Sequence, residues 1–364
     1  MNSDSDSDKA PTKRKTRRPA NTAFRQQRLK AWQPVLTPKT VLPLFFGVTC
    51  LFALFGGLLL KASSTVQELI IDYTHCGDVG SQPTAIPSNK VQYSFKHGKS
   101  PEHLLWSQNN GVCTLTFDIP TEMEPPVYMF YRLTNFYQNH RRYVLSYNQD
   151  QLQGKPKTAA ELRSDDDCKP LIVNEEGKPY YPCGLISNSL FNDTFSALYN
   201  DQGTNYTMTT KGIAWSSDRN WFRKTQYNAS DVVPPRNWAK MFPDGYTDEN
   251  LPDISTWEEL QNWMRTAGLP TFSKLSRRND KESLMPGTYS VDIGLNFNTT
   301  VYNGRKMMVL STRSVIGGRN SFLGIAYIVV AGLSCALGVA FLIHHVLRPR
   351  RIGDHTYLSW NQTN

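Results

Sequence analysis

The sequence has few of the residues that build catalytic and metal centres. Four histidines lie between its two long apolar runs, at positions 75, 97, 103 and 140, and no two of them have ligand spacing. No His-Glu-x-x-His, Gly-x-Ser-x-Gly, Walker or Gly-x-Gly-x-x-Gly motif occurs. The triplet Asp165-Asp166-Asp167 lacks the spacing of a calcium loop and is typical of a solvated acidic loop. We therefore predict no catalytic residue, metal site or cofactor, although Ser, His and Asp side chains from distant segments that converge in the fold remain an alternative.

Cysteine is also scarce. Of six cysteines, Cys50 and Cys335 lie inside the apolar runs, where we expect them to be small packing residues. The other four lack Cys-x-x-Cys spacing, which favours disulfides over a zinc site, and they allow three pairings. We favour Cys168 with Cys183, because they close a short local loop. A loop of about 15 residues stabilises by roughly 3 kcal/mol. We also favour Cys76 with Cys113, which flank the stretch after the first apolar run.

Charge is absent from two long stretches. Residues 41–60 and 322–343 contain no Asp, Glu, Lys, Arg or His. As helices rising 1.5 Å per residue, each spans about 30 Å, the thickness of a bilayer's hydrocarbon core. Core helices are normally shorter, and a cleaved signal peptide does not fit the 40 residues that precede the first run. We therefore predict two transmembrane helices.

Positive charge is concentrated at the two ends of the chain. Residues 1–40 hold ten Lys and Arg against three Asp, residues 61–321 hold 27 charges of each sign, and residues 344–364 hold three Arg against one Asp. The positive-inside rule then predicts cytosolic tails and a lumenal or extracellular domain over 61–321. The basic excess is thus a topology signal and gives no support to nucleic-acid binding. A plain solvated, disordered tail is the preferred interpretation of Lys13 to Arg18, and attraction to anionic inner-leaflet lipids is the alternative.

Glycosylation sequons agree with this orientation. Asn-x-Ser/Thr sites are modified only on the lumenal side, and four of them fall within 61–321. A fifth, Asn361, lies in the C-terminal tail and should stay unmodified. The four candidate glycosylation sites are Asn192, Asn205, Asn228 and Asn298.

Residues 61–321 carry mostly strand patterns. The clearest places an apolar residue at every second position from Tyr289 to Phe297, as in a half-buried strand. We predict a mainly antiparallel-β domain, sandwich-like, with short helices and long loops. Because strands occur at both ends of the segment, the two transmembrane helices should enter this domain close together. The predicted strands cover 91–95, 113–119, 127–133, 289–297 and 307–312.

Two short helices are expected in the same segment. Ser255 and Glu258 have capping-box spacing ahead of an apolar face, and Gly268 and Pro270 follow as stop signals. A second helix is predicted over 185–198.

The second apolar run is rich in small residues. Gly332 and Ala336, and likewise Ser334 and Gly338, lie four apart on common helix faces, which permits close helix packing. Such a face fits either the first helix of the same chain or a helix of a partner. Neither run has the ionisable residues that mark a transport route, so transport by this chain alone is not expected.

Residues 135–143 interleave aromatic residues with Arg141 and Arg142. This pattern would indicate stacking on nucleic-acid bases in another compartment. With a lumenal location, a structural role is the preferred interpretation, and contact with a partner is the alternative.

Several long stretches together resemble one family. They are Asn21-Thr-Ala-Phe-Arg-Gln-Gln-Arg-Leu-Lys-Ala-Trp-Gln-Pro34, residues 135–143, Tyr181-Pro-Cys-Gly184, residues 188–195, Gly212-Ile-Ala-Trp215, Trp263-Met-Arg-Thr-Ala267, Gly317-Gly-Arg-Asn320 and residues 323–327. From Arg17 to Tyr357 the chain resembles the cell division control protein 50 family, the β-subunits of type IV P-type ATPase phospholipid flippases. Residues 228–235, 244–257 and 353–357 are similar to its fungal branch.

The resemblance implies a noncatalytic subunit in a heterodimer. The partner ATPase would hydrolyse ATP and move phospholipid to the cytosolic leaflet, and this chain would support its exit from the endoplasmic reticulum, its stability and its reaction cycle. The Cys168–Cys183 bond and the glycan on Asn192 would be family features. The implied partner-binding residues are Asn21, Phe24, Arg25, Arg28 and Trp32 at the cytosolic side, with Arg319 at the entrance of the second helix.

Two other classes share this topology. A trimeric two-helix ligand-gated cation channel also has a large disulfide-bonded domain, but usually has more cysteines and a polar pore-lining helix. A membrane-anchored lumenal receptor would need no second chain. The expected division is a tail over 1–40, helices over 41–60 and 322–343, the lumenal domain over 61–321 and a tail over 344–364. The implied route runs from the endoplasmic reticulum to the Golgi, endosomes or plasma membrane.

Overall fold

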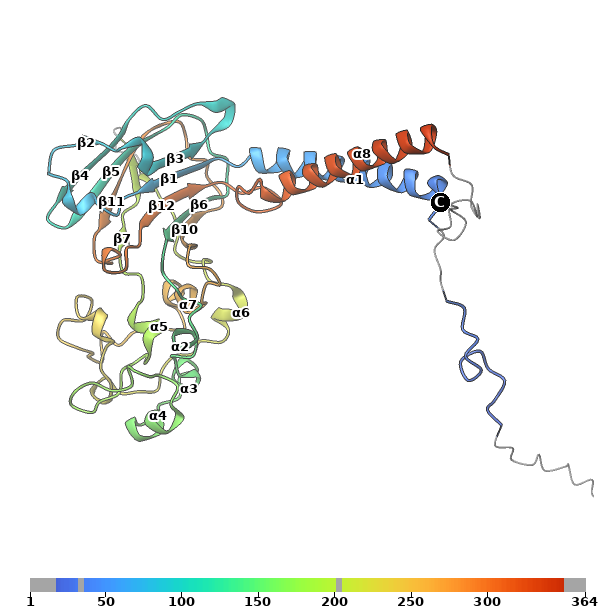
Figure 1. The fold of residues 1–364 in the computed structure, drawn as a ribbon. Helices are drawn as coiled ribbons and strands as arrows, with labels where there is room; N and C mark the ends of the chain where they lie inside the picture. The colour runs from blue at the N-terminus through green and yellow to red at the C-terminus, as the bar shows by residue number, and fades with distance from the viewer. Residues whose placement is uncertain (1–17, 32–35, 201–204, 350–364) are drawn as a thin grey trace, which may run out of the picture. The chain divides into compact units, whose positions relative to one another are not determined.

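A computed structural model describes residues 18–31, 36–200 and 205–349. The chain forms two compact units, one of residues 54–328 and the other made by the chain on either side of it. Two long helices, α1 (Pro38–Ser64) and α8 (Phe322–Leu347), precede and follow a central domain of residues 65–321 in the sequence (Figure 1).

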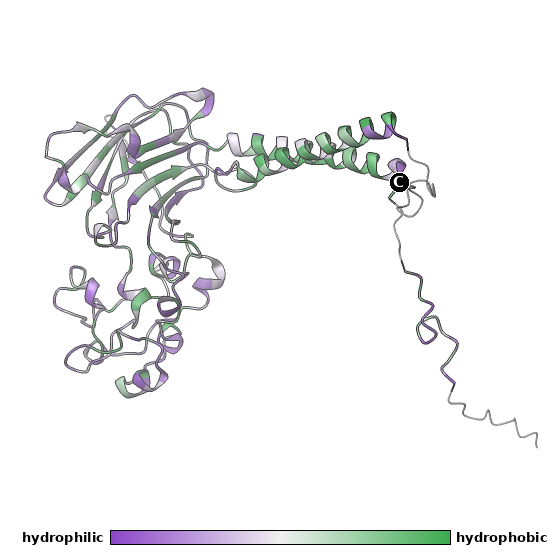
Figure 2. Cartoon of the chain, in the orientation of Figure 1, coloured by the Kyte–Doolittle hydropathy of each residue, from purple (hydrophilic) through white to green (hydrophobic). Residues whose placement is uncertain are grey.

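Both long helices are apolar along nearly their whole length (Figure 2). They are the two helices in the described part of the chain that are long and apolar enough to cross a membrane. Each contains the run predicted from the sequence and extends it by a few residues, so that Lys39 and Lys61 lie near the ends of α1.

The central domain is built from two antiparallel sheets. A five-stranded sheet has the order β10-β6-β12-β1-β3, and a second sheet has the order β2-β4-β5-β11-β8-β9, with β7 also paired to β11. The strands of the first are β1 (Glu68–Asp72), β3 (Val91–Ser94), β6 (Val127–Leu133), β10 (Phe272–Asn279) and β12 (Lys306–Ser311). Those of the second are β2 (Thr84–Ala85), β4 (Leu104–Asn109), β5 (Val112–Ile119), β7 (Thr194–Phe195), β8 (Leu198–Asn200), β9 (Asn205–Tyr206) and β11 (Gly287–Gly294).

The two sheets share one hydrophobic core, as in a β-sandwich. Alternate residues of β6 and β12, such as Met129 and Leu310, face alternate residues of β5 and β11, such as Phe117 and Val291, and all four are buried. This period of two is what the alternating sequence pattern predicted. The predicted mainly antiparallel-β sandwich with short helices is confirmed.

A long excursion separates the neighbouring strands β6 and β10. Residues 134–271 leave the first sheet, contribute β7, β8 and β9 to the second, and form a lobe of short helices before they return. The helices are α2 (Arg141–Val144), α3 (Gln149–Leu152), α4 (Ala159–Asp165), α5 (Leu185–Asn188), α6 (Ser216–Arg219) and α7 (Glu258–Met264).

The strand predicted over 289–297 ends earlier than expected, at Gly294. The backbone N–H groups of Asn296 and Phe297 both donate to Oδ1 of Asp193, each at 2.6 Å, and therefore do not continue a ladder. An acceptor 103 residues away in the sequence ends this strand.

The helix predicted over 185–198 is wrong beyond its first turn. α5 ends at Asn188, and residues 194–195 and 198–200 are strands paired with β11. Buried Phe195 and Leu198 enter the sandwich core, so tertiary packing overrides the local helical pattern.

The predicted capping box is also wrong. Ser255 Oγ donates to Asp253, and α7 begins after Trp257 without a side-chain cap. Glu258 Oε2 instead accepts the N–H of Ala214 at 3.0 Å. The capping box that does form joins Thr158 and Glu161 at the start of α4.

Candidate functional site

Strand pairing and hydrogen bonds connect the ends of the long helices to the central domain. β1 follows α1, β12 precedes α8, and the two strands pair with Glu68 opposite Ser311. Asn320 N donates to Ser63 Oγ at 3.1 Å, and buried Gln67 bonds to Thr312 across the same junction. The expectation that both helices enter the domain close together is confirmed, and a displacement of the helix ends would be transmitted to the sheet.

The two long helices pack closely where glycines lie on them. A Cβ at Gly338 would lie 3.2 Å from the Cβ of Phe45, and one at Gly324 would collide with Leu60. Thr49 Oγ1 donates to the carbonyl oxygen of Phe45 on its own helix at 2.9 Å and lies 3.4 Å from that of Ala331 on α8. Small residues of α8 therefore serve contact within the chain, one of the two alternatives left open by the sequence.

A second small face on α8 remains exposed. Gly332, Ala336 and Ala340 are four residues apart, so they align along the helix, and all three are exposed. No atom lies within 4 Å of a Cβ built at Gly332. At 100° per residue this face lies about 140° from the one that carries Ala331 and Gly338. The described chain thus leaves a surface suited to close approach of another membrane helix.

The N-terminal candidates occupy a short segment of turns. Asn21, Phe24, Arg25 and Arg28 are all exposed. Arg28 donates to the Asn21 side chain, and Arg25 N donates to Thr22 Oγ1 at 3.2 Å, so these bonds stay within the segment. Trp32 lies outside the described residues. The other predicted contact residue, Arg319, is exposed at the junction. Burial raises the pKa of nearby Glu68, and the charges of Arg132 and Arg319 oppose this shift.

A buried ion pair connects the first sheet to the segment just before β7. Lys306 Nζ, on β12, lies 2.7 Å from Oδ2 of Asp193, and both side chains are almost fully buried. The same carboxylate accepts the hydroxyl of Tyr73 at 3.0 Å and two backbone N–H groups, while Lys306 also donates to the carbonyl of Phe297 at 2.7 Å. Sequence reasoning missed this pair, because nothing local relates positions 193 and 306.

Burial sets the electrostatics of this cluster. Desolvation lowers the pKa of Lys306, and the neighbouring Asp193 carboxylate opposes that shift. Desolvation, with Asp193 as the next cause, raises the pKa of Tyr73 well above its usual value. Tyr73 thus stays a neutral donor, and both charges of the pair have hydrogen-bond partners, as buried charges require.

The candidate glycosylation sites differ in exposure. Asn205, Asn228 and Asn298 are exposed, whereas Asn192 is half-buried. Asn298 Oδ1 accepts the N–H and hydroxyl of Thr300, the third residue of its sequon, at 3.0 and 2.8 Å. The middle residue of the Asn192 sequon is Asp193, so the buried ion pair sets the position of that site.

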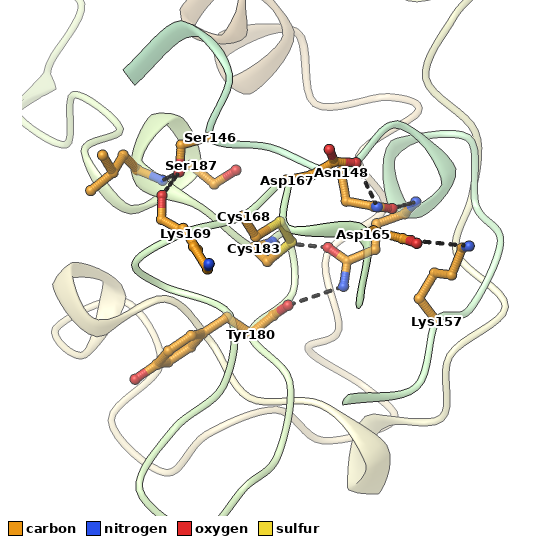
Figure 3. Close-up of a disulfide and its surroundings, with 12 residues drawn as sticks. Ser146, Asn148, Lys157, Asp165, Asp167, Cys168, Lys169, Tyr180, Cys183 and Ser187 are labelled. Carbon is orange, nitrogen blue, oxygen red and sulfur yellow. Dashed lines mark hydrogen bonds and ion pairs between the residues drawn. A yellow bond between two sulfur atoms is a disulfide. The ribbon is translucent and has the colours of Figure 1, made fainter. Parts of the chain in front are cut away.

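The structure contains both disulfides favoured by the sequence. Cys76–Cys113 joins the segment after β1 to β5 inside the sandwich, and Cys168–Cys183 closes the lobe of short helices. Figure 3 shows the bonds around the second disulfide. Cys183 N donates to Gln151 Oε1 at 2.9 Å, and Ser146 Oγ donates to the carbonyl of Lys169 at 2.7 Å.

The Pro-Cys-Gly motif next to this disulfide has a steric reason for its glycine. Gly184 has φ of 97°, and a Cβ there would collide with the carbonyl oxygen of Ser146. The helix that follows, α5, receives two indole N–H donors, from Trp238 to Ser187 O and from Trp263 to Ile186 O, both at 2.9 Å. Large buried aromatics therefore hold this part of the lobe rigid.

The acidic triplet lies beside the same disulfide. Asp165 pairs with Lys157 at 3.3 Å, and Asp167 accepts from Asn148 at 3.4 Å (Figure 3). Asp166 pairs with Lys169. No group of three or more His, Cys, Asp or Glu side chains converges among the described residues. The triplet is exposed at the end of α4, and two of its three carboxylates have lysine partners.

Residues 135–143 divide into a buried and an exposed set. Phe136 lies edge-on to Tyr143 and Trp263, with ring centroids 5.9 and 5.6 Å apart, and Gln138 accepts the N–H of Ala267. Arg141 and Arg142 in α2 are exposed and form no ion pair with a described residue. Phe136 and Tyr143 have a structural role, whereas Tyr137 and the two arginines are exposed and remain available to a partner.

Lys274 is a buried cation at the end of a helix. Its Nζ donates to the carbonyls of Asn262, at 2.7 Å, and Arg265, where the dipole of α7 favours positive charge. Burial, with Arg265 as the second cause, lowers the pKa of Lys274 to about 8.

This pKa predicts a pH dependence of stability. Below pH 8 the folded and unfolded chains both carry the proton, whereas between about pH 8 and 10.5 only the unfolded chain does, so the unfolding free energy rises with pH. Relative to Lys274→Met, the wild type should gain about 1 to 2 kcal/mol between about pH 7 and pH 9.5. Thermal unfolding of the full chain in detergent measures this, with exposed Lys281→Met as control. A wild-type advantage that stays constant over this range would contradict the assignment.

Fold and site together define a class: a two-helix membrane protein with a disulfide-bonded antiparallel-β domain, whose exposed surfaces are suited to binding another protein. Residues 59–351 match the LEM3 (ligand-effect modulator 3) family / CDC50 family. The chain belongs to this family, as its sequence motifs indicated.

Relatives from fungi and animals align over most of the chain. It is 45% identical over 359 residues to the phospholipid-transporting ATPase accessory subunit CRF1 of Saccharomyces cerevisiae, and this alignment covers 96% of this chain and 91% of the relative. It is 41% identical over 375 residues to the accessory subunit CDC50 of Chaetomium thermophilum, over 95% of this chain and 91% of the relative. With the cell cycle control protein 50A of Bos taurus it shares 41% over 344 residues, covering 90% and 89%.

Proposed function

We propose that this chain is the noncatalytic accessory subunit of a P-type ATPase that transports phospholipid, and that the two form a heterodimer. Relatives named accessory subunits of phospholipid-transporting ATPases align with it nearly end to end. The structural observation that carries the proposal is the exposed small face of Gly332, Ala336 and Ala340. Because Ala331 and Gly338 already pack against α1, this second face of α8 is available to a helix of another chain.

The rest of the molecule fits a subunit that supports a moving partner. The apolar runs contain no ionisable residue that would mark a substrate route, so the lipid would pass through the ATPase. The bonded junction and the disulfides give the central domain one arrangement relative to the ends of its helices. Contacts worth about 1 to 3 kcal/mol would then change a conformational equilibrium of the partner 5- to 150-fold.

The orientation belongs to the same proposal. Both tails would be cytosolic, because the excess of Lys and Arg lies there, and the central domain would be lumenal, with its four sequons and two disulfides. Residues 21–34 would contact the cytosolic parts of the ATPase, and Arg319 would contact it at the opposite surface. The complex would leave the endoplasmic reticulum for the Golgi, endosomes or plasma membrane.

Purification in mild detergent tests this function. The full chain should bring down a P-type ATPase in about equimolar amount, and deletion of the chain should retain that ATPase in the endoplasmic reticulum. Normal ATPase traffic and lipid uptake without the chain, in cells that express no related subunit, would refute the proposal. Cation current from the purified chain alone in a planar bilayer would favour the channel instead.

A bulky residue on the small face should break the complex. Ala336→Leu would separate helices that approach closely, and we expect recovery of the ATPase to fall about tenfold or more, since loss of such packing costs on the order of 1 to 3 kcal/mol. Val330→Phe adds similar bulk on another exposed side of α8 and should leave recovery unchanged. Equal recovery with both variants would show that this face contacts lipid only.

A further inference from the structure

A cavity of about 530 Å³ opens on the outer face of the five-stranded sheet. Its floor is formed by outward-facing side chains of β6 and β10, including Tyr128 and Leu275, and one wall by the loop that ends at Trp215. Gly318, four residues before α8, lies at its edge. All of these residues belong to the same compact unit.

The cavity is cationic. Lys274, Arg278 and Arg313 contribute to its lining, and no Asp or Glu occurs among the described residues that line it. Arg278 is fixed in place, because its guanidinium donates to Asp280 and to the carbonyl of Gly212 at 2.8 Å. Arg313 is exposed and forms no ion pair with a described residue. An unpaired arginine beside aromatic side chains is suited to bind a phosphate group.

An apolar turn lies directly beside the cavity. Ser314 and Gly317 exchange two backbone hydrogen bonds, at 2.8 and 3.0 Å, and the turn that they close presents Val315 and Ile316. Val315 is fully exposed and Ile316 is half exposed. Two adjacent aliphatic residues at the tip of a tight turn are unusual on a surface that meets only water.

Both features are close enough to the start of α8 to reach the membrane surface. Gly318 is four residues from Phe322, so at most about 14 Å of chain separate the cavity's edge from the start of α8. Headgroups occupy roughly the first 5 to 8 Å outside the hydrocarbon core. The exposed indole of Trp215 is a side chain typical of this interface, and the Arg265 guanidinium lies 4.6 Å from its ring centre.

We propose that this cavity binds the phosphate group of a bilayer phospholipid, with Arg313 as its principal ligand and the turn at Val315 and Ile316 inserted among the lipids. Charge complementarity selects an anion, and continuity with α8 selects the bilayer as its source. The site belongs to this chain alone and does not depend on the proposed accessory function.

The test uses the full chain in nanodiscs of equal parts phosphatidylcholine and phosphatidylserine. Native mass spectrometry should find a phospholipid retained by the wild type, and a photoreactive phosphatidylcholine should label residues 311–318. Arg313→Glu should lower this occupancy about tenfold or more, since a charge-assisted hydrogen bond is lost and a repulsion is added. Gly318→Trp should do the same by filling the cavity's edge, because no atom lies within 4 Å of a Cβ at that position.

The matched control is Arg305→Glu, an exposed arginine just before β12, whereas Arg313 follows its other end. It should leave occupancy unchanged, and unchanged unfolding midpoints would show that all three variants fold. Equal occupancy in Arg313→Glu and wild type overturns the proposal. Equal retention of phosphate-free galactolipids also overturns it, and so does full occupancy by inorganic phosphate in detergent without phospholipid. The proposal is overturned as well if an acidic segment of a partner ATPase occupies the cavity in place of lipid.

Discussion

Replacing Asp193 by Asn is expected to lower the unfolding free energy of this protein by about 3 to 5 kcal/mol. The change removes the counterion of Lys306, whose ammonium group would remain almost fully buried with neutral partners only, such as the Phe297 carbonyl. For a domain of this size we expect a fall of roughly 10 °C in the unfolding midpoint. Thermal unfolding of the full chain in detergent measures it.

Asp193→Asn has the advantage that it preserves the sequon at Asn192, so a loss of stability cannot be attributed to loss of a glycan. Glu124→Gln is the control, because it breaks an exposed pair with Lys96 and should cost no more than about 1 kcal/mol. The double variant Asp193→Asn/Lys306→Met should recover part of the loss, since no buried charge is left unpaired. Similar midpoints for Asp193→Asn and Glu124→Gln would show that the buried pair contributes little.

Loss of the Cys76–Cys113 bond should have an effect of similar size. The bond spans 37 residues, and the chain-entropy model gives about 4 kcal/mol for a loop of that length. Both cysteines are completely buried, so alanine is the better replacement because it leaves no unpaired hydroxyl in the core. Cys76→Ala/Cys113→Ala should therefore lower the unfolding midpoint by roughly 10 °C.

The second disulfide provides a graded comparison. Cys168–Cys183 spans 15 residues and lies in a satellite cluster of the lobe, so its double alanine variant should lose about 3 kcal/mol. Cys50→Ala/Cys335→Ala changes the two free cysteines and should leave the midpoint unchanged. A larger loss from the second bond than from the first would contradict the assignment of the main core to the sandwich.

The ion pair and the two disulfides make the central domain resistant to deformation. Asp193 belongs to the excursion between β6 and β10, whereas Lys306 belongs to β12, so their pairing holds the excursion against the sheet that leads into α8. Gln67, Thr312 and Asn320 then connect that sheet to the helix ends. An accessory subunit that stabilises one state of a partner would require such a rigid connection between its membrane and lumenal surfaces.

Local patterns in the sequence predicted some elements well and others poorly. The strand at 127–133 was predicted with the bounds that it has, because its alternation reflects the core that it faces. The helix predicted over 185–198 was wrong because Phe195 packs into the sandwich core as part of a strand. The Ser255–Glu258 capping box was wrong because the Glu258 carboxylate accepts the N–H of Ala214 instead. Where a residue's main partner lies more than 40 positions away, a local motif is a poor guide.

The candidate surfaces show the same division. The small residues of α8 are evident in the sequence, but only the packing of α1 decides that Ala331 and Gly338 face inward and that Gly332, Ala336 and Ala340 do not. The cationic cavity brings together β6, β10, the loop at 212–215 and the turn before α8, which no spacing rule connects.

The sequence by itself determined the two apolar helices, the placement of the basic excess and the antiparallel-β character of the domain, because each follows from the composition of a continuous stretch. It also favoured the disulfide pairing that the structure contains. Only the tertiary structure decided the burial of Asp193 with Lys306, the ends of α5 and β11, and which faces remain exposed. These features depend on contacts between segments that are distant in the chain. A local sequence pattern carries no information about the free energy of such contacts.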